Sequence, residues 1–294
     1  MKKTERSKPS AGRTSRASYR RHPMSLVQRI AVTASAVITF AILVALLAYI
    51  LIMGVPNLKP SLFAWHYTSD NCSMTPAIIN TLIMVVLSLL LSVPFGIGAA
   101  IYLVEYAKRG NKLVKVVRLT AETLSGIPSI VYGLFGYLMF VIALNMDKSM
   151  LAGALTLAIM VLPTILRTTE EALKAVPDSF REGSFGLGAG KLRTVFRIVL
   201  PSAVPGIFSG IILAIGRIVG ESAALLYTAG FGMALVSLFD SLHTSSATLT
   251  VALYVYATEG GETALAFSIA TILMVLTLLI NLTAGIIGRK LKRK

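Results

Sequence analysis

The sequence predicts an all-α integral membrane protein with six transmembrane helices. Of its 294 residues, 55% are apolar and only 14% are charged, and the mean hydropathy is +0.77. A soluble domain of this length would carry far more charge on its surface. Several apolar runs also reach the ~18 residues that a helix needs to cross about 30 Å of hydrocarbon.

Six apolar runs are candidate membrane spans. We place them at Ile30–Met53, Ile78–Val104, Pro128–Leu144, Leu151–Leu166, Ala203–Tyr227 and Ala264–Gly288. The third and fourth runs are short, so we expect them to tilt or to extend. The first run exceeds the roughly 7 to 15 apolar residues of a cleaved signal sequence, and we expect it to remain as a span.

The basic residues fall almost entirely in alternate connecting segments. Of the 28 Lys and Arg, nine precede Ile30, five lie in 105–118, six in 167–200 and five follow Gly288. The positive-inside rule makes these segments, and therefore both termini, cytoplasmic. The expected organisation is a basic, disordered tail (1–29), a first transmembrane helix (30–53), an extracytoplasmic loop (54–76), a transmembrane domain (77–288) and a basic cytoplasmic C-terminus (289–294).

Several other classes of site are excluded or disfavoured. The basic tail contains no aromatic platform or nucleic-acid-binding module, so we expect it to contact anionic membrane lipid and no nucleic acid. The single Cys72 rules out an intrachain disulfide, and the three histidines are too scattered for a metal site. An integral-membrane enzyme acting on lipid diphosphates would need clustered carboxylates. The four aspartates are isolated, and we predict no catalytic residue.

A polar, glycine-rich segment separates the fourth and fifth runs. Pro177 suits the first position of a helix, and Gly188 can end that helix with a positive φ. Phe180, Ser184 and Leu187 lie at helical spacing in the first half, and Leu192, Val195, Phe196 and Val199 in the second. The pattern predicts two short amphipathic helices joined at a glycine corner, presenting an apolar ridge to a partner's groove or to the membrane surface.

The glycine cluster at this corner does not form a phosphate-binding P-loop. That motif requires a glycine, four residues and then Gly-Lys-Ser/Thr. The only Gly-Lys pair is Gly190 and Lys191, Phe185 occupies the first glycine position, and Leu192 replaces the hydroxyl. We therefore expect ATP to bind elsewhere.

The stretch Glu182–Pro201 resembles the EAA loop of ABC importer permeases. That pattern is Glu, two alanines, three residues, Gly, nine residues, and then Ile, any residue, Leu and Pro. Glu182, Gly188, Ile198, Leu200 and Pro201 match it. Gly183 and Ser184 replace the two alanines. The resemblance implies that loop 167–200 couples this chain to a separate nucleotide-binding subunit.

Further segments are similar to the phosphate-specific importer permeases. They are Glu122–Leu138, Arg167–Ser184 and Ile212–Ala229, and the run from Arg167 to Leu173 resembles the PstA branch more than its sister PstC. The resemblance implies a type I ABC importer permease in the prokaryotic inner membrane. It further implies a second homologous permease, two ATP-binding subunits that carry ATP and Mg²⁺, and an extracytoplasmic phosphate-binding protein. This chain itself would hold no cofactor. Sulfate, molybdate and phosphonate remain alternative substrates.

Arg217 and Glu221 are four residues apart inside the fifth predicted span. A central charge costs about 2.5–3.5 kcal/mol on membrane-insertion scales, so these two residues need a partner or a function. One interpretation is a self-neutralising pair that fixes helix packing. The other is a substrate pathway, in which Arg217 binds an oxyanion and Glu221 prevents the anion from binding too tightly.

Small residues and a proline predict how the spans pack and bend. Gly206, Gly210, Gly216 and Gly220 repeat at four-residue spacing, which permits close helix approach. Pro128 and Ser129 stand where the third span begins, and we expect them to bend or cap its entrance.

Overall fold

The structure, a computed structural model, describes residues 23–108, 110–233, 238–259 and 261–292, and every regular element in these ranges is helical. The chain divides into two compact units, Met1–Ile52 and Met53–Lys294. The second unit carries all of the predicted functional residues.

Most of helix α1 (Pro23–Gly54) belongs to the first unit. Proline suits the start of a helix, and α1 begins at Pro23 rather than at the predicted Ile30. Residues 23–29, predicted as the end of a disordered tail, are therefore helical. Residues 1–22 of the predicted tail lie outside the described residues. The apolar side chains of α1 are exposed within this chain, as expected for a helix that meets lipid.

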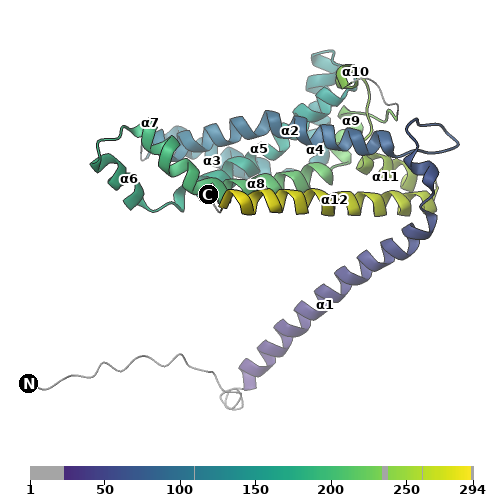
Figure 1. Cartoon of the computed structure of the whole chain (residues 1–294), viewed down its shortest axis with the longest axis horizontal. Helices are drawn as coiled ribbons and strands as arrows, with labels where there is room; N and C mark the ends of the chain where they lie inside the picture. Colours follow the sequence, from purple (N-terminus) through teal and green to yellow (C-terminus); the bar gives the residue numbers. More distant parts are fainter. Residues whose placement is uncertain (1–22, 109, 234–237, 260, 293–294) are drawn as a thin grey trace, which may run out of the picture. The chain divides into compact units, whose positions relative to one another are not determined.

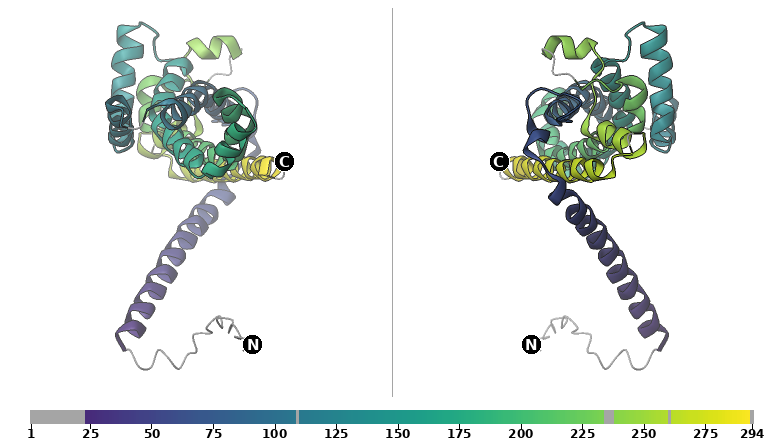
Figure 2. Two further views of the ribbon diagram at one scale, coloured as in Figure 1. Left: turned by 90° about the vertical axis from the view of Figure 1, so that its left-hand side faces the viewer. Right: turned by 90° about the vertical axis from the view of Figure 1, so that its right-hand side faces the viewer.

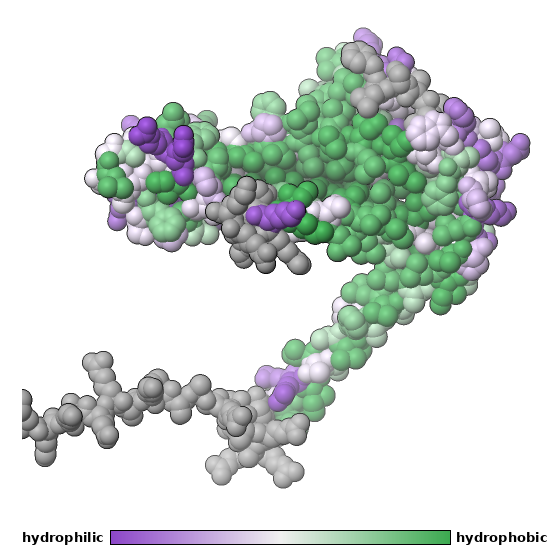
Figure 3. Space-filling model, in the orientation of Figure 1, coloured by the Kyte–Doolittle hydropathy of each residue, from purple (hydrophilic) through white to green (hydrophobic). Residues whose placement is uncertain are grey.

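Four long helices of the second unit pack side by side (Figure 1): α2 (Thr75–Ile101), α5 (Met150–Lys174), α8 (Leu200–Val219) and α12 (Thr263–Lys292). The short helices α6 (Asp178–Gly186) and α7 (Lys191–Thr194) lie at one end, where α6 covers the end of the bundle in the left view of Figure 2. Helix α11 (Leu249–Thr258) lies toward the opposite end, together with the 3-10 turns η2 (Val55–Asn57) and η3 (Pro60–Phe63). Figure 3 shows apolar surface along the bundle and polar residues at its two ends, the distribution that suits a membrane.

Among the described residues, five helices are long and apolar enough to span a membrane, and a bent pair supplies a sixth. The pair consists of α3 (Lys112–Ser125) and α4 (Ser129–Gly136), the latter continued by the π-helical η5 (Tyr137–Ala143). The two parts meet at 105°. The predicted third span corresponds to α4 and η5, so six spans are present when the bent pair is counted as one.

Helix α3 is held against α5 by an ion cluster at the same end of the bundle as α6. Arg118 and Lys174 each lie 2.6 Å from the Oε1 atom of the buried Glu170. Asn111 caps α3 by accepting a hydrogen bond from the backbone N–H of Leu113. Helix α3 is amphipathic, so apolar contacts can hold only one of its faces. The ion cluster adds a polar attachment to α5.

Two helices differ in their limits from the apolar runs that predict them. The fourth run extends, as expected for its short length: α5 continues past Leu166 to Lys174 through a polar stretch supported by the i,i+4 pair of Arg167 and Glu171. The fifth is not one helix. Helix α8 ends at Val219, and α9 (Ala223–Thr228) begins after a break that contains Gly220.

Two segments predicted as loops also contain helix. The stretch between the predicted fifth and sixth spans, which end at Tyr227 and begin at Ala264, carries α10 (Leu238–His243) and α11, which Thr248 caps by accepting the N–H of Val251. The predicted C-terminal tail 289–294 is helical as far as Lys292, and its last two residues lie outside the described part of the chain.

Candidate functional site

The glycine corner between the fourth and fifth spans is present. Residues 178–199, which we call the α6–α7 hairpin, comprise α6, α7 and the π-helical η6 (Val195–Val199). Gly188 has φ +81°, and its N–H donates to the carbonyl of Phe185. A residue with a side chain is disfavoured in this left-handed conformation, so the corner depends on glycine.

The predicted apolar ridge of the second half is split between the core and the surface. Val195 and Val199 are 1% and 0% exposed and pack with the buried Leu173. Leu192 and Phe196 instead are 66% and 51% exposed. In the first half, Phe180, Phe185 and Leu187 are also exposed. The expectation that all four residues of the second half face a partner is therefore wrong, and the exposed apolar side chains of both halves form the surface that a partner can meet.

The five residues that match the EAA pattern lie on or beside this surface. Glu182, Gly188 and Pro201 are exposed, whereas Ile198 and Leu200 are half-buried. Ile198 lines a groove of about 460 Å³ together with Leu187, Gly188, Arg193 and Arg197. The exposed arginines make one wall basic, which favours a partner surface with acidic groups.

The departure from the EAA pattern has a structural reason at Ser184. This side chain is buried, and its hydroxyl lies 2.8 Å from the hydroxyl of Thr194, joining the two arms of the hairpin. An alanine at 184 would leave Thr194 without this partner. Gly183 differs, because a Cβ added there meets nothing within 4 Å.

Arg181 is a hairpin residue that the sequence reasoning missed. Its Nη2 and Nε donate to Oε1 of Glu105 at 2.7 and 3.2 Å, and Glu105 belongs to η4 (Tyr102–Tyr106), the π-helical continuation of α2. The two residues are 76 positions apart. Opposite charges in two basic segments were the only available signal, and they do not specify a pair.

Arg217 and Glu221 do not lie in one helix, although the sequence predicts both to lie inside the fifth span. Arg217 is half-buried in the last turn of α8, and its Nη1 donates to Oγ1 of Thr164 on α5 at 3.3 Å. Glu221 lies beyond the end of α8, is 8% exposed, and accepts the N–H of Ala224 at 3.0 Å. The described ion pairs do not include one between Arg217 and Glu221. The Glu221 carboxylate therefore accepts an N–H in the first turn of α9, and Arg217 is left with the Thr164 hydroxyl as its described hydrogen-bond partner.

The four glycines predicted to pack divide into two groups. A Cβ on Gly206 would lie 2.6 Å from Cβ of Ala172, and one on Gly210 would lie 2.0 Å from Oγ1 of Thr168, so α8 crosses α5 too closely for a side chain. Gly216 has open space beside it, and Gly220 meets only the carbonyl of Gly216. The close approach predicted for this second pair is not made within the described chain.

Pro128 and Ser129 stand at the bend of the third span. Pro128 is the N-cap of α4, and α4 begins at Ser129, directly after the 105° bend. The hydroxyl of Tyr132 donates to the carbonyl of Leu124 at 2.8 Å, which bridges the two parts of the bent span.

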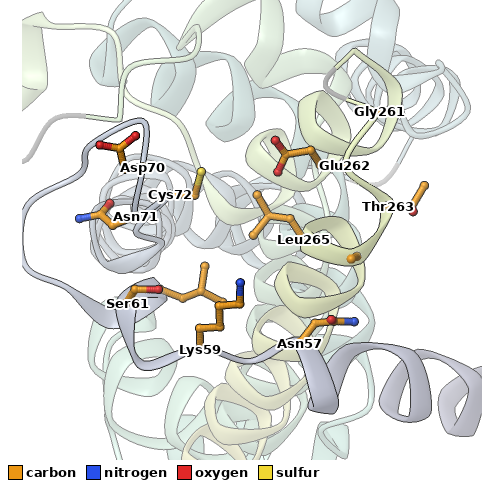
Figure 4. Close-up of a pocket in the computed structure, with 12 residues that line it drawn as sticks. Asn57, Lys59, Ser61, Asp70, Asn71, Cys72, Gly261, Glu262, Thr263 and Leu265 are labelled. Atoms are coloured by element: carbon orange, nitrogen blue, oxygen red, sulfur yellow. The ribbon is translucent and has the colours of Figure 1, made fainter.

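A polar pocket of about 430 Å³ lies at the end of the bundle opposite the hairpin. Figure 4 shows Lys59 and Asp70 on the segment before α2, facing Glu262 and Leu265 at the start of α12. Its mixed charge does not favour a free anion. No group of three His, Cys, Asp or Glu suited to a metal ion occurs among the described residues.

Residues 92–293 match the family described as binding-protein-dependent transport system inner membrane component. The chain belongs to this family. It is therefore a multi-pass inner-membrane permease, the translocation subunit of an ABC transporter, and ATP hydrolysis belongs to another subunit of such systems.

Similar proteins include permeases with and without a stated substrate. The probable ABC transporter permease protein YqgI of Bacillus subtilis is 39% identical over 200 residues, 66% of this chain and 67% of that protein. The phosphate transport system permease protein PstA 1 of Mycobacterium tuberculosis is 37% identical over 213 residues, 72% of this chain and 69% of that protein. PstA of Pasteurella multocida is 36% identical over 239 residues, 79% of this chain and 83% of that protein.

Solved ABC transporters share the fold of the permease at low sequence identity. A bacterial alginate ABC transporter has a TM-score of 0.63 at 15% identity, covering 94% of this chain and 96% of that chain. The inward-facing MetNI methionine transporter has a TM-score of 0.61 at 20% identity, covering 74% of this chain and 95% of that chain. The predicted fold class, an ABC importer permease, is thereby confirmed.

Proposed function

We propose that this permease moves inorganic phosphate into the cell as part of an ATP-driven importer. The observation that carries the proposal is the 36–37% identity to permeases of phosphate transport systems over 72–79% of the chain. The half-buried Arg217 supports an anionic substrate, because a guanidinium offers fixed positive charge and paired donors to an oxyanion.

The proposed assembly contains a second, homologous permease, two ATP-binding subunits and an extracytoplasmic phosphate-binding protein. ATP and Mg²⁺ would be held by the ATP-binding subunits, and no cofactor by this chain. The α6–α7 hairpin would dock on an ATP-binding subunit, with Glu182, Gly188, Ile198, Leu200 and Pro201 at or beside the contact. Its exposed apolar residues support this role, because a helix with such a face buries it in a partner's groove.

The orientation and organisation follow from the basic residues. The hairpin and both termini would be cytoplasmic, since the Lys- and Arg-rich segments concentrate there. The segment 54–76 and the pocket beside it would then face outward. The tail 1–29, with its helical part from Pro23, would lie near anionic lipid.

The mechanism would use two states of the whole assembly. Closure of the ATP-binding subunits moves the hairpins, and the helices joined to them rock between outward- and inward-facing arrangements. Arg217 would hold phosphate in the pathway through charge-assisted hydrogen bonds. In the structure, Nη1 of Arg217 donates a hydrogen bond to the hydroxyl of Thr164. A hydroxyl is a weaker partner for a guanidinium than an anion is, so phosphate could replace it.

Uptake of labelled phosphate by cells with and without this chain tests the substrate. We expect uptake only in cells that contain the chain, with inhibition by unlabelled phosphate and little inhibition by a tenfold excess of sulfate, molybdate or phosphonate. Equal inhibition by one of those anions would assign the permease to that oxyanion instead. Cells that express the chain with Gly188→Trp, in which we expect the hairpin corner to be disrupted, serve as the matched control for expression.

A further inference from the structure

The end of α2 contacts both arms of the α6–α7 hairpin through two consecutive residues. Glu105 Oε1 lies 2.7 Å from Nη2 of Arg181 on α6. The ring centroid of Tyr106 lies 5.2 Å from Nζ of Lys191, the first residue of α7. Both contacts come from the π-helical turn η4. Such turns are rare and frequently occur at functional positions.

All five N–H donors of Arg181 are used. Besides the two bonds to Glu105, Nη1 donates to the carbonyl of Val176 at 2.8 Å and to Oδ1 of Asp178 at 3.2 Å, and Nη2 donates to the carbonyl of Leu173 at 3.0 Å. The two carbonyls belong to Leu173 in the last turn of α5 and to Val176 just after it, where the i+4 N–H donors of the helix run out. One side chain therefore joins α2, α5 and α6.

Burial distinguishes this ion pair from an ordinary surface pair. The side chains of Arg181 and Glu105 are 15% and 8% exposed, whereas those of Arg167 and Glu171 are 62% and 65% exposed. An exposed pair contributes little to structure. Separating the partners of a buried pair leaves a buried charge without compensation, which is strongly unfavourable. The contact between Arg181 and Glu105 should therefore persist when the hairpin moves.

The covalent chain connects the hairpin only to α5, which precedes it, and to α8, which follows it. Helix α2 has no covalent connection there, although its continuation η4 contacts both arms. We propose that Arg181 and Glu105 are positioning residues for transport: they make the hairpin and the end of α2 move as one body, so that a third membrane helix follows the motion of the ATP-binding subunit. This inference rests on the proposed docking of that subunit at the hairpin.

A shared rigid body is a physical route for coupling, because the hairpin cannot shift without moving the α2 end or breaking the buried pair. Without the pair, the hairpin would still be attached to α5 and α8 and would still present its docking surface. Loss of the pair should therefore separate two properties. The ATP-binding subunits remain bound, but their ATP hydrolysis no longer drives uptake efficiently.

The test uses the complete importer reconstituted in lipid vesicles with phosphate-loaded binding protein. The variants are Arg181→Gln and Glu105→Gln, and the readouts are copurification of the ATP-binding subunits, ATP hydrolysis, and labelled phosphate accumulated per ATP. We expect normal copurification and about a tenfold fall in phosphate per ATP. The double variant should be no worse than either single variant, because the two residues act as one pair, and Arg181→Lys should recover part of the loss.

Arg167→Gln is the matched control, since it removes an exposed arginine from an ion pair within one helix. We expect it to change phosphate per ATP by less than twofold. If Arg181→Gln fails to assemble, Glu105→Gln decides the question. A ratio within twofold of the unaltered importer in an assembled Arg181→Gln or Glu105→Gln variant would overturn the proposal.

Failure of the proposed function would look different. If the ATP-binding subunits did not copurify with the unaltered chain, or the unaltered importer accumulated no phosphate, the assignment of the importer itself would be wrong. Failure of the inference alone leaves the unaltered importer active and the Arg181 and Glu105 variants equally active.

Discussion

Replacement of Arg217 by glutamine is expected to lower phosphate uptake about 100-fold or more while the permease still assembles. Each hydrogen bond to a charged group contributes about 1.5–3 kcal/mol, and an oxyanion bound by a guanidinium fork loses two of them. A loss of about 3 kcal/mol corresponds to a factor of roughly 100 or more. Initial rates of labelled phosphate uptake, normalised to permease in the membrane, measure the effect.

Assembly and thermal stability separate this pathway role from a packing role. Glutamine removes a half-buried charge from α8 and retains a donor for Thr164, so the stability of the variant should stay the same or rise. If Arg217 only fixed helix packing, Arg217→Gln would lose stability and keep its uptake per assembled permease. Full uptake with normal assembly would exclude Arg217 from the pathway.

Replacement of Gly188 is expected to disconnect ATP hydrolysis from uptake. The left-handed conformation costs a residue with a side chain about 1–2 kcal/mol. In Gly188→Ala, the population of the corner conformation relative to alternative conformations should therefore fall about 5- to 30-fold. Gly188→Trp adds an indole on the exposed docking surface and should abolish uptake. Copurification of the ATP-binding subunits and uptake per ATP measure the loss.

Gly183→Ala and Gly186→Ala are the matched controls for this prediction. Both glycines lie in α6, neither has a positive φ, and a Cβ at either meets nothing within 4 Å. Alanine is more favourable than glycine in an exposed helix by about 1 kcal/mol. Both substitutions should therefore leave α6 intact, and both variants should transport normally. Coupling that survived Gly188→Trp would contradict the role of the hairpin corner.

Run lengths and charge placement were sufficient to predict most of the fold. An apolar run must cover the hydrocarbon thickness, so its length reports a membrane span directly. Hydropathy does not report where a helix continues into a polar segment, so it could not show that α5 extends past Leu166 as far as Lys174. Nor does it reveal the break at Gly220, which removes Glu221 from the helix of Arg217 and lets its carboxylate accept an N–H in the first turn of α9.

The candidate site was predictable where chemistry is local in sequence. The corner at Gly188 depends on one backbone conformation, and the periodicity on either side predicts two short helices. The pairs formed by Ser184 with Thr194 and by Arg181 with Glu105 depend on how separate segments meet. A single sequence places all of these residues in basic or amphipathic segments and does not specify which of them touch.

Reconstitution of the purified assembly in sealed vesicles tests the central claim most directly. With ATP enclosed and phosphate-loaded binding protein outside, we expect labelled phosphate to accumulate inside above its external concentration, only when this chain is present. Labelled sulfate and molybdate should not accumulate. ATP hydrolysis without phosphate accumulation in vesicles that contain the complete assembly, or equal accumulation of sulfate, would contradict the account.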